Sequence, residues 1–437
     1  MTHRQAPFVV AGATLVLGAA IGLALRGVEP MATWLYQFAW YPTIALMAAL
    51  VARREGRDPL SAHPLHALSL FAWSAVFWFF FELLNWRLRD WYYVNVPGDR
   101  TARWLGISLA FATVLPAIFL AARVLQSWGL LVSVRTAPLR VTRAGLRLTS
   151  LAGAVFLVLP LVWPDWFFPL VWGATTLLAE PALYLRERRW SLLGDLERGD
   201  AGRILRLLAG GAAIGLLWEW FNSMARSRWI YTVPGLDRLK VFEMPLLGFL
   251  GFPVFALECW SVFHLLACFG ISTPEEPAAH PVRVRRKMVT AAVGVAFSVF
   301  VLAGMERFTI SSTTPQLVGV PGLPASAAFL LEAQGETPFD LARESASDVA
   351  RRAGVSVDEA LPWIESARLV TLRGIGTTNA ARLARVGVTD LAALARQDPD
   401  TLAARLRRLD GADRGRRVTP AETRVWVSAA QAELERP

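Results

Sequence analysis

Long apolar runs alternate with short polar loops throughout residues 1–306. Nine of these runs are long enough to cross the roughly 30 Å hydrocarbon core of a bilayer. They cover residues 8–25, 34–52, 67–86, 104–124, 147–163, 166–185, 207–223, 244–270 and 288–305. The pattern predicts an all-α fold, a polytopic membrane helix bundle of about nine spans that occupies residues 1–306.

Loop charge predicts the orientation of the bundle. The loops after the second, fourth, sixth and eighth runs contain more arginine and lysine than the loops on the opposite side. Cytoplasmic loops collect such residues, so we expect a bacterial inner-membrane protein with a cytoplasmic N-terminus. Nine spans then place the C-terminus outside, and a miscount by one reverses that result. A cleaved signal peptide and a retained anchor both fit the first run, and its length favours the anchor.

Composition excludes a single soluble domain. Hydrophobic residues make up 54% of the 437 residues and charged residues only 18%, with a net charge of +10. Soluble chains contain roughly 25% charged residues. Cys259 and Cys268 lie in one apolar run and are interpreted as packing residues, and no Cys/His metal spacing occurs. We therefore predict no metal and no cofactor, and the absence of common catalytic motifs leaves enzyme activity open.

The membrane part repeats a polar motif at an offset of 137 residues. The two copies are Glu82, Asn85 and Arg89, and Glu219, Asn222 and Arg226. The offset covers four predicted spans, an even number, so both copies have the same orientation. This indicates a parallel internal duplication with halves at about 34–124 and 166–270.

Two interpretations of the repeated motif remain open. Positions i, i+3 and i+7 fall on one helix face. In the first interpretation the motif is an interfacial cap in which glutamate and arginine neutralise each other. In the second, the two copies face each other and build a polar cavity, because ionisable groups inside membranes usually face cavities. The cavity would belong to an enzyme or carrier for a lipid-like molecule, and the six motif residues would be its candidate catalytic residues.

Two further acidic residues are catalytic candidates. Glu243 opens the eighth run, and Glu258 lies in the middle of it, where a lone carboxyl is costly. We expect Glu258 to need a partner, with Arg226 or Asn222 as candidates.

The pattern of aromatic, acidic and proline residues in Trp229-Ile230-Tyr231 and Phe242-Glu243-Met244-Pro245 resembles the small membrane lycopene cyclases. The resemblance covers residues 75–260 and implies a duplicated few-span protein that acts on isoprenoid chains. The paired acid that follows proline in that family is absent, because Pro245 precedes two leucines.

The composition changes after Arg307, where short helical patterns with glycine breaks begin. We expect a linker at 307–315 and an all-α domain at 316–437. Within that domain, residues 322–342 align with residues 374–394 at an offset of 52. The segment Leu372-Arg373-Gly374-Ile375-Gly376, with its two glycines, resembles a tandem helix-hairpin-helix domain over about 316–431.

In nucleic-acid-binding members of that family, hairpin N–H groups and the next helix hold a phosphate. The resemblance therefore implies these phosphate-binding candidates: Gly374, Ile375, Gly376, Arg373, Arg382 and Arg385. Pro324 replaces the second glycine in the first copy and removes a donor. Residues 307–366 hold four arginines against eight acids, whereas residues 367–437 hold thirteen against eight. A protein partner or self-association through 316–437 is favoured, and nucleic acid binding and a purely structural cap stay open.

Overall fold

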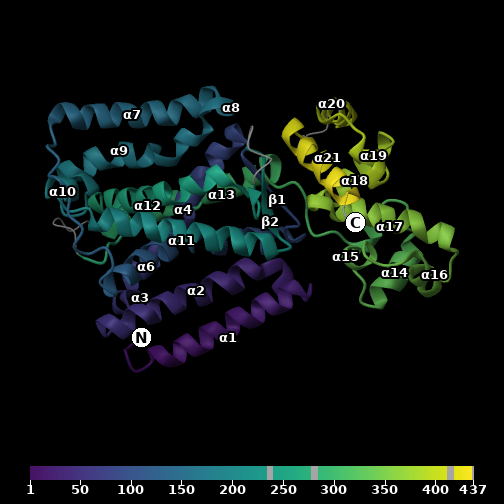
Figure 1. Cartoon of the computed structure of the whole chain (residues 1–437), viewed down its shortest axis with the longest axis horizontal. Helices are drawn as coiled ribbons and strands as arrows, with labels where there is room; N and C mark the ends of the chain where they lie inside the picture. Colours follow the sequence, from purple (N-terminus) through teal and green to yellow (C-terminus); the bar gives the residue numbers. More distant parts are fainter. Residues whose placement is uncertain (234–239, 277–283, 411–417, 436–437) are drawn as a thin grey trace. The chain divides into compact units, whose positions relative to one another are not determined.

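The computed structural model is almost entirely helical and describes residues 1–233, 240–276, 284–410 and 418–435 (Figure 1). It divides into two compact units. The first contains Met1–Asp90, Trp104–Ala225 and Val233–Ala303, and the second contains Trp91–Arg103, Arg226–Thr232 and Gly304–Pro437. The predicted all-α class and the polytopic bundle are confirmed.

Long helices that run roughly alongside one another build the first unit (Figure 1). In chain order, the helices that lie wholly or mostly in it are α1 Ala6–Leu25, α2 Met31–Glu55, α3 Pro59–Ala62, α4 Pro64–Leu88, α5 Arg100–Phe111, α6 Val114–Ser127, α7 Arg143–Val162, α8 Pro164–Phe167, η1 Phe168–Leu170, α9 Val171–Arg186, α10 Leu192–Glu197, α11 Gly202–Met224, η2 Leu246–Leu250, α12 Gly251–Cys268 and α13 Val284–Phe308. A two-residue hairpin, β3 Lys240–Val241 with β4 Met244–Pro245, precedes η2. Within the described residues, eight helical stretches are long and apolar enough to cross a membrane.

The sixth predicted span differs from the prediction of one continuous helix over 166–185. The chain there forms α8, η1 and then α9, and Trp172 and Gly173 inside α9 have non-helical dihedral angles. Gly173 has φ of 113°, a value that side chains with a Cβ rarely adopt. The glycine therefore permits a break that apolar periodicity alone does not reveal.

The fourth span is also broken, between α5 and α6. Ser74 of α4 repairs the gap, because its hydroxyl donates to the Phe111 carbonyl at 2.7 Å and accepts from the Leu115 N–H at 3.0 Å. Ser74 is fully buried. One hydroxyl thus satisfies both backbone groups that the break exposes.

Replacement of Ser74 by alanine is expected to lower the thermal stability of the purified chain in detergent. The buried Leu115 N–H would lose its acceptor, which costs about 1–3 kcal/mol. Ser127→Ala is the matched control, because the Ser127 hydroxyl donates to the Val124 carbonyl of its own helix, one turn earlier. Equal unfolding temperatures for the two variants would contradict the bridging role.

A short antiparallel ribbon forms in the second unit from β1 Trp91–Val94 and β2 Arg228–Tyr231. Residues 309–314 run beside β1 in parallel. The Tyr93 N–H donates to the Thr309 carbonyl at 2.8 Å, and the Thr314 N–H donates to the Val96 carbonyl at 2.8 Å. The segment predicted as a linker, 307–315, is therefore paired along most of its length.

The rest of the second unit, the C-terminal module (residues 316–437), consists of short helices. They are η3 Leu317–Gly319, α14 Ala325–Ala333, α15 Pro338–Leu341, α16 Ala346–Ala353, α17 Val357–Thr371, η4 Leu372–Gly374, α18 Gly376–Arg385, α19 Leu391–Ala395, α20 Pro399–Asp410 and α21 Pro420–Leu434. Separate apolar cores lie under α14–α17 and under α18–α21. Both α17 and α21 begin with a capping box, Ser356 with Glu359 and Thr419 with Glu422, which fixes where each helix starts.

Candidate functional site

The two copies of the repeated acid and amide lie near the C-terminal ends of α4 and α11. Glu82, Asn85, Glu219 and Asn222 are all fully buried. The Trp78 indole N–H donates to Glu82 Oε1 at 3.2 Å, and the Asp90 N–H donates to Asn85 Oδ1 at 2.9 Å. The sequence motif thus marks polar groups that are held inside the protein.

Aromatic side chains bring the two helices together. The Trp78 and Trp218 rings are 5.0 Å apart between centroids, and Trp40 packs edge-on against Trp218 at 6.1 Å. The Tyr36 hydroxyl donates to the Trp218 carbonyl at 2.8 Å. Trp78 is one turn before Glu82 and Trp218 immediately precedes Glu219, so both copies of the motif start from one aromatic cluster.

The two arginines lie beyond the ends of their helices, so the prediction that they share a helix face with the glutamates is wrong. Helix α4 ends at Leu88, and Arg89 is left-handed with φ of 61°. Helix α11 ends at Met224, and the Arg226 guanidinium lies over the Phe339 ring in the second unit, 4.3 Å from its centroid. Each helix stops before position i+7, so helical periodicity does not apply to the arginine.

Glu243 lies in the tight turn between β3 and β4 and is 5% exposed. The preceding residue, Phe242, has φ of 58°, which is uncommon for a bulky side chain. A strained residue next to a buried carboxyl is the pattern that functional sites often show.

Glu258 has a different partner from the two that the sequence suggested. Its Oε1 accepts the Gly173 N–H at 2.8 Å and the Thr175 N–H at 2.9 Å, and the side chain is fully buried. The carboxyl therefore caps the break in α9, where backbone donors lack helical acceptors. Neither Arg226 nor Asn222 is needed for this role.

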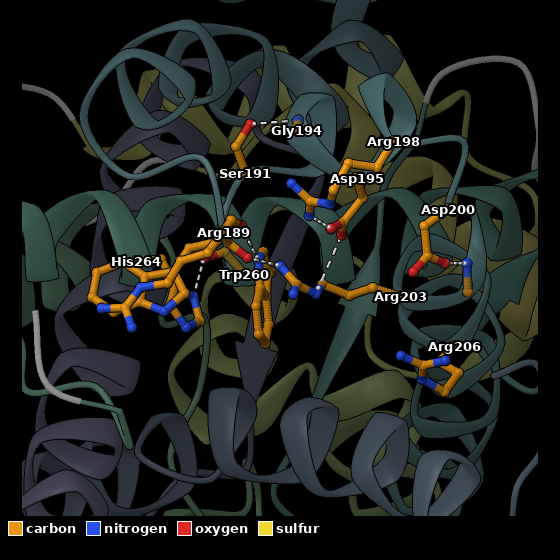
Figure 2. A network of polar contacts seen from close by, with 12 residues as sticks. Arg189, Ser191, Gly194, Asp195, Arg198, Asp200, Arg203, Arg206, Trp260 and His264 are labelled. Atoms are coloured by element: carbon orange, nitrogen blue, oxygen red, sulfur yellow. Dashed lines mark hydrogen bonds and ion pairs between the residues drawn. The ribbon is translucent and has the colours of Figure 1, made fainter. Parts of the chain in front are cut away.

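A polar network at the other end of the first unit was missed by sequence reasoning (Figure 2). Asp195 of α10 pairs with Arg203 of α11 at 3.3 Å and with Arg198. Arg203 also donates to the Arg189 carbonyl at 2.9 Å and lies over the Trp260 ring, 4.9 Å from its centroid. Burial raises the pKa of Asp195, and the nearby Arg203 and Arg198 charges partly offset that effect. The loop arginines, interpreted from sequence only as an orientation signal, form this network.

Glu180 extends this network into the bundle. Its Oε1 accepts from the Ser261 hydroxyl at 2.7 Å, and its Oε2 accepts from the Ser191 hydroxyl at 2.7 Å and the Leu193 N–H at 3.1 Å. The carboxyl therefore ties α9 to α12 and to the start of α10. His264 is a packed residue, since its Nδ1 donates to the Trp260 carbonyl at 2.9 Å.

The predicted phosphate-binding hairpin (Gly374, Ile375 and Gly376) is buried within the second unit. A Cβ on Gly374 would lie 2.3 Å from Val94 Cβ of β1, and one on Gly376 would lie 2.6 Å from Ser312 Cβ. The Ser312 hydroxyl donates to the Gly374 carbonyl at 2.6 Å.

The three arginine candidates lie around this hairpin. Arg373 is left-handed with φ of 44°, Arg382 donates to Asn379 Oδ1 at 3.1 Å, and Arg385 is exposed. The structure therefore places one of the three in open contact with solvent, while the hairpin itself packs against the chain's own residues. Phosphate binding by this set stays a prediction.

Among the described residues, no three His, Cys, Asp or Glu side chains lie close enough to hold a metal ion.

Asp90, in the turn between α4 and β1, is expected to make stability depend on pH. Burial and the negative charge of Asp165 raise the pKa of Asp90 to about 7, and one pKa unit corresponds to about 1.4 kcal/mol. The neutral acid favours folding, so its contribution is complete below about pH 4 and is lost as the pH rises through about 7.

The measurement is thermal unfolding in detergent across pH for Asp90→Asn and the wild type. We expect the variant to unfold at a higher temperature above pH 7 and at the same temperature near pH 4, since the amide cannot ionise. The exposed Asp358 provides the control Asp358→Asn. Parallel pH curves for Asp90→Asn and the wild type would exclude this role.

Comparison with known proteins identifies one domain. A domain of unknown function, DUF4332, matches residues 324–433, which lie within the C-terminal module. Neither the curated proteins nor the solved structures contain a match to the chain. The helix-hairpin-helix and lycopene cyclase resemblances therefore stay predictions.

Proposed function

We propose that this integral membrane protein uses its C-terminal module as a protein-contact domain, and that the second hairpin binds the chain's own β1–β2 ribbon. The packing of Gly374 and Gly376 against Val94 and Ser312 carries the proposal. Glycines let two backbones approach closely, so their function here is protein packing. The module would hold the loops of the membrane domain and present its remaining surface to a protein partner or a second copy.

Further contacts between the module and these segments support the proposal. The Ser311 hydroxyl donates to Glu422 Oε1 at 3.0 Å, and the Asn379 amide donates to the Ser311 carbonyl at 3.4 Å. Val425 of α21 packs against the apolar cluster of Tyr92, Val94 and Ile230. The ribbon therefore meets α18 through the hairpin and α21 through its apolar face.

Nucleic acid is less well supported as the ligand of this hairpin. A phosphate at the N-terminus of α18 needs open backbone N–H groups, yet Gly374, Ile375 and Gly376 are buried. Nucleic acid binding would require Val94 and Ser312 to move away from the hairpin.

Hydrogen exchange on the purified full chain tests the docking. We expect slow exchange for the amides of 374–376 in the wild type and fast exchange in Val94→Asp. Val318→Asp changes a half-exposed valine of the same module and should leave these amides slow. Fast exchange in the wild type, or salt-sensitive DNA or RNA binding that is lost in Arg373→Ala, would overturn the proposal.

Strand pairing also supports nine membrane crossings. β1 and β2 can pair only on one side of the membrane, so an even number of spans must separate them. The helices between them are α5–α6, α7, α9 and α11. The number of membrane crossings between the two strands is even only if the broken stretch around α9 also crosses the membrane. The N-terminus and the module would then lie on opposite sides of the membrane.

Labelling of single cysteines with a membrane-impermeant reagent tests this topology in a background with Cys259→Ala and Cys268→Ala. Ser347→Cys lies on the module and Arg53→Cys at the end of α2, and both positions are exposed. We expect the first to be labelled in intact spheroplasts and the second only after permeabilisation. Labelling of both from one side would contradict nine crossings.

A second candidate function is an enzyme or carrier for an isoprenoid or lipid-like molecule. It is favoured by the burial of Glu82, Asn85, Glu219 and Asn222 beside the aromatic cluster of Trp40, Trp78 and Trp218. Glu82→Gln and Glu219→Gln conserve shape and remove the carboxyl. The lipids that co-purify with each variant, identified by mass spectrometry, should differ from those of the wild type. An unchanged lipid profile in stably folded variants would exclude this function.

A further inference from the structure

We propose that Glu258 is a proton-binding site inside the membrane domain, connected to the α10 end of the bundle by Ser261, Glu180 and Ser191. A proton adds to Oε2 of the carboxylate and forms an O–H bond there, while Oε1 keeps its two backbone N–H bonds. The proton comes from water at that end of the bundle. This inference is independent of the docking of the C-terminal module.

The geometry of the carboxyl separates its two oxygens. Oε1 accepts the N–H groups of Gly173 and Thr175 and so has a structural role. Oε2 is buried and has no hydrogen-bond partner among the described residues. An ionised oxygen without a donor in a low-dielectric interior is costly, and protonation removes that cost.

A hydroxyl group lies beside the carboxyl. The Thr175 side chain lies next to the Glu258 carboxyl. The Thr175 and Thr176 hydroxyl oxygens are buried and, within the described part of the chain, lack hydrogen-bond partners. A protonated carboxyl is a donor, and the Thr175 hydroxyl can accept from it. Glu258 and Thr175 therefore form a polar pair at the break in α9.

A line of polar groups leads from Glu258 towards the α10 end. Ser261 follows Glu258 by three residues, or about 4.5 Å along the axis of α12. Its hydroxyl donates to Glu180 Oε1, and Glu180 Oε2 accepts from Ser191 at the start of α10. Buried carboxyls and hydroxyls in succession are the usual components of a membrane proton relay.

Only the second half of the membrane domain contains this line. At the 137-residue offset, Ala121 corresponds to Glu258, Thr43 to Glu180 and Val124 to Ser261. A general requirement of the fold would appear in both halves, so the difference favours a specific task over packing.

Within the part of the chain that the structure describes, no charged group neutralises Glu258. The elements that pack against α12 are α4, α6, α9, α11 and η2. Their titratable groups, with those of α12 itself, are His66, Glu82, Arg87, Arg123, Glu180, Tyr184, Arg186, Arg203, Arg206, Glu219, Cys259, His264 and Cys268. None of these forms an ion pair or hydrogen bond with Glu258 among the described residues. A proton is therefore the counter-charge that the site can take.

Infrared difference spectroscopy of the full chain in detergent, titrated between about pH 4 and about pH 9, tests the proposal. We expect the wild type to gain the carbonyl-stretch band of a protonated carboxylic acid as the pH falls, with a shift in D₂O. Glu258→Gln should lose this band and still fold, because the amide oxygen accepts the same two N–H groups. Glu55→Gln, at the end of α2, should keep it.

Two results would overturn the inference. One is that the Glu258→Gln spectrum keeps every titrating band of the wild type, which would make Glu258 a permanently ionised helix cap. The other is that the band lost in Glu258→Gln is also lost from the wild type when Na⁺ replaces K⁺ at constant pH, which would make the site a metal-cation site. If Glu258→Gln fails to fold, Thr175→Val, which keeps the Glu258 carboxyl, should still move the band, and an unmoved band would count against the polar pair.

Discussion

Replacement of Gly374 by alanine is expected to separate the hairpin from the β1–β2 ribbon and to lower the unfolding temperature of the chain markedly. The new Cβ would lie 2.3 Å from Val94 Cβ, closer than atoms in contact can approach. Gly374 also has φ of 67°. The left-handed conformation costs about 1–2 kcal/mol for alanine, and overpacking adds about 1–3 kcal/mol. Thermal unfolding and hydrogen exchange of residues 91–96 would measure both effects.

Gly387 provides the control for backbone strain. Its φ is 78°, but a Cβ there would meet nothing within 4 Å. Gly387→Ala should therefore show the backbone strain without the clash, and the amides of residues 91–96 should stay protected from hydrogen exchange in this variant. Val94→Gly combined with Gly374→Ala should recover part of the loss, because the clashing atom is gone. Equal effects for Gly374→Ala and Gly387→Ala would mean that the hairpin does not dock on Val94.

Gly173→Ala is expected to have the second large effect, because it strains the break that Glu258 caps. Its φ of 113° is almost confined to glycine, and forcing such a conformation costs about 1–3 kcal/mol. A Cβ would also lie 3.3 Å from Val254 Cγ1. We expect a lower unfolding temperature in detergent and a carbonyl band of protonated Glu258 that moves to higher wavenumber, since the Gly173 N–H moves away from Oε1 and no longer hydrogen-bonds it.

Gly251, at the start of α12 opposite the break, is the matched control. It has φ of −68°, and a Cβ there would make an ordinary contact with Trp172 at 3.5 Å. Gly251→Ala should therefore leave stability and the band nearly unchanged. A similar loss in both variants would show that the α9–α12 contact tolerates no added volume, and that backbone strain at Gly173 is not the cause.

The membrane helices could be predicted from sequence because apolar length alone reports them. The breaks could not be predicted, since a hydroxyl such as Ser74 or a carboxyl such as Glu258 satisfies the backbone from another helix. Hydropathy contains no information on such long-range partners. The same reason explains why Glu258 was matched to the wrong partners.

The repeated motif was informative for burial and misleading for geometry. Glu82 and Glu219 are buried as an internal polar site requires. The arginine at i+7 is different, because Arg89 and Arg226 lie beyond the helix ends. Residue spacing predicts a common face only where the helix continues, and neither helix end has a clear stop signal.

The C-terminal hairpin was predicted from its glycines, but its neighbour was not. Val94 and Ser312 are distant from Gly374 in sequence and show no motif. A glycine-rich hairpin fits a phosphate or a protein backbone equally well, because both require close approach. Only the fold distinguishes the two.

The register of the β1–β2 ribbon has a consequence for the origin of the chain. Trp91 pairs with Tyr231, and Val94 pairs with Arg228. At the 137-residue offset, Trp91 corresponds to Arg228 and Val94 corresponds to Tyr231, so each of the two pairs is the counterpart of the other. Such a register is self-complementary, as in an interface between identical subunits related by a twofold axis. The internal duplication predicted from the sequence would follow from a half-length chain whose strand paired with its own copy in a homodimer. Fusion of two such copies would release one half from symmetry, and Glu180 and Glu258 occur in one half alone.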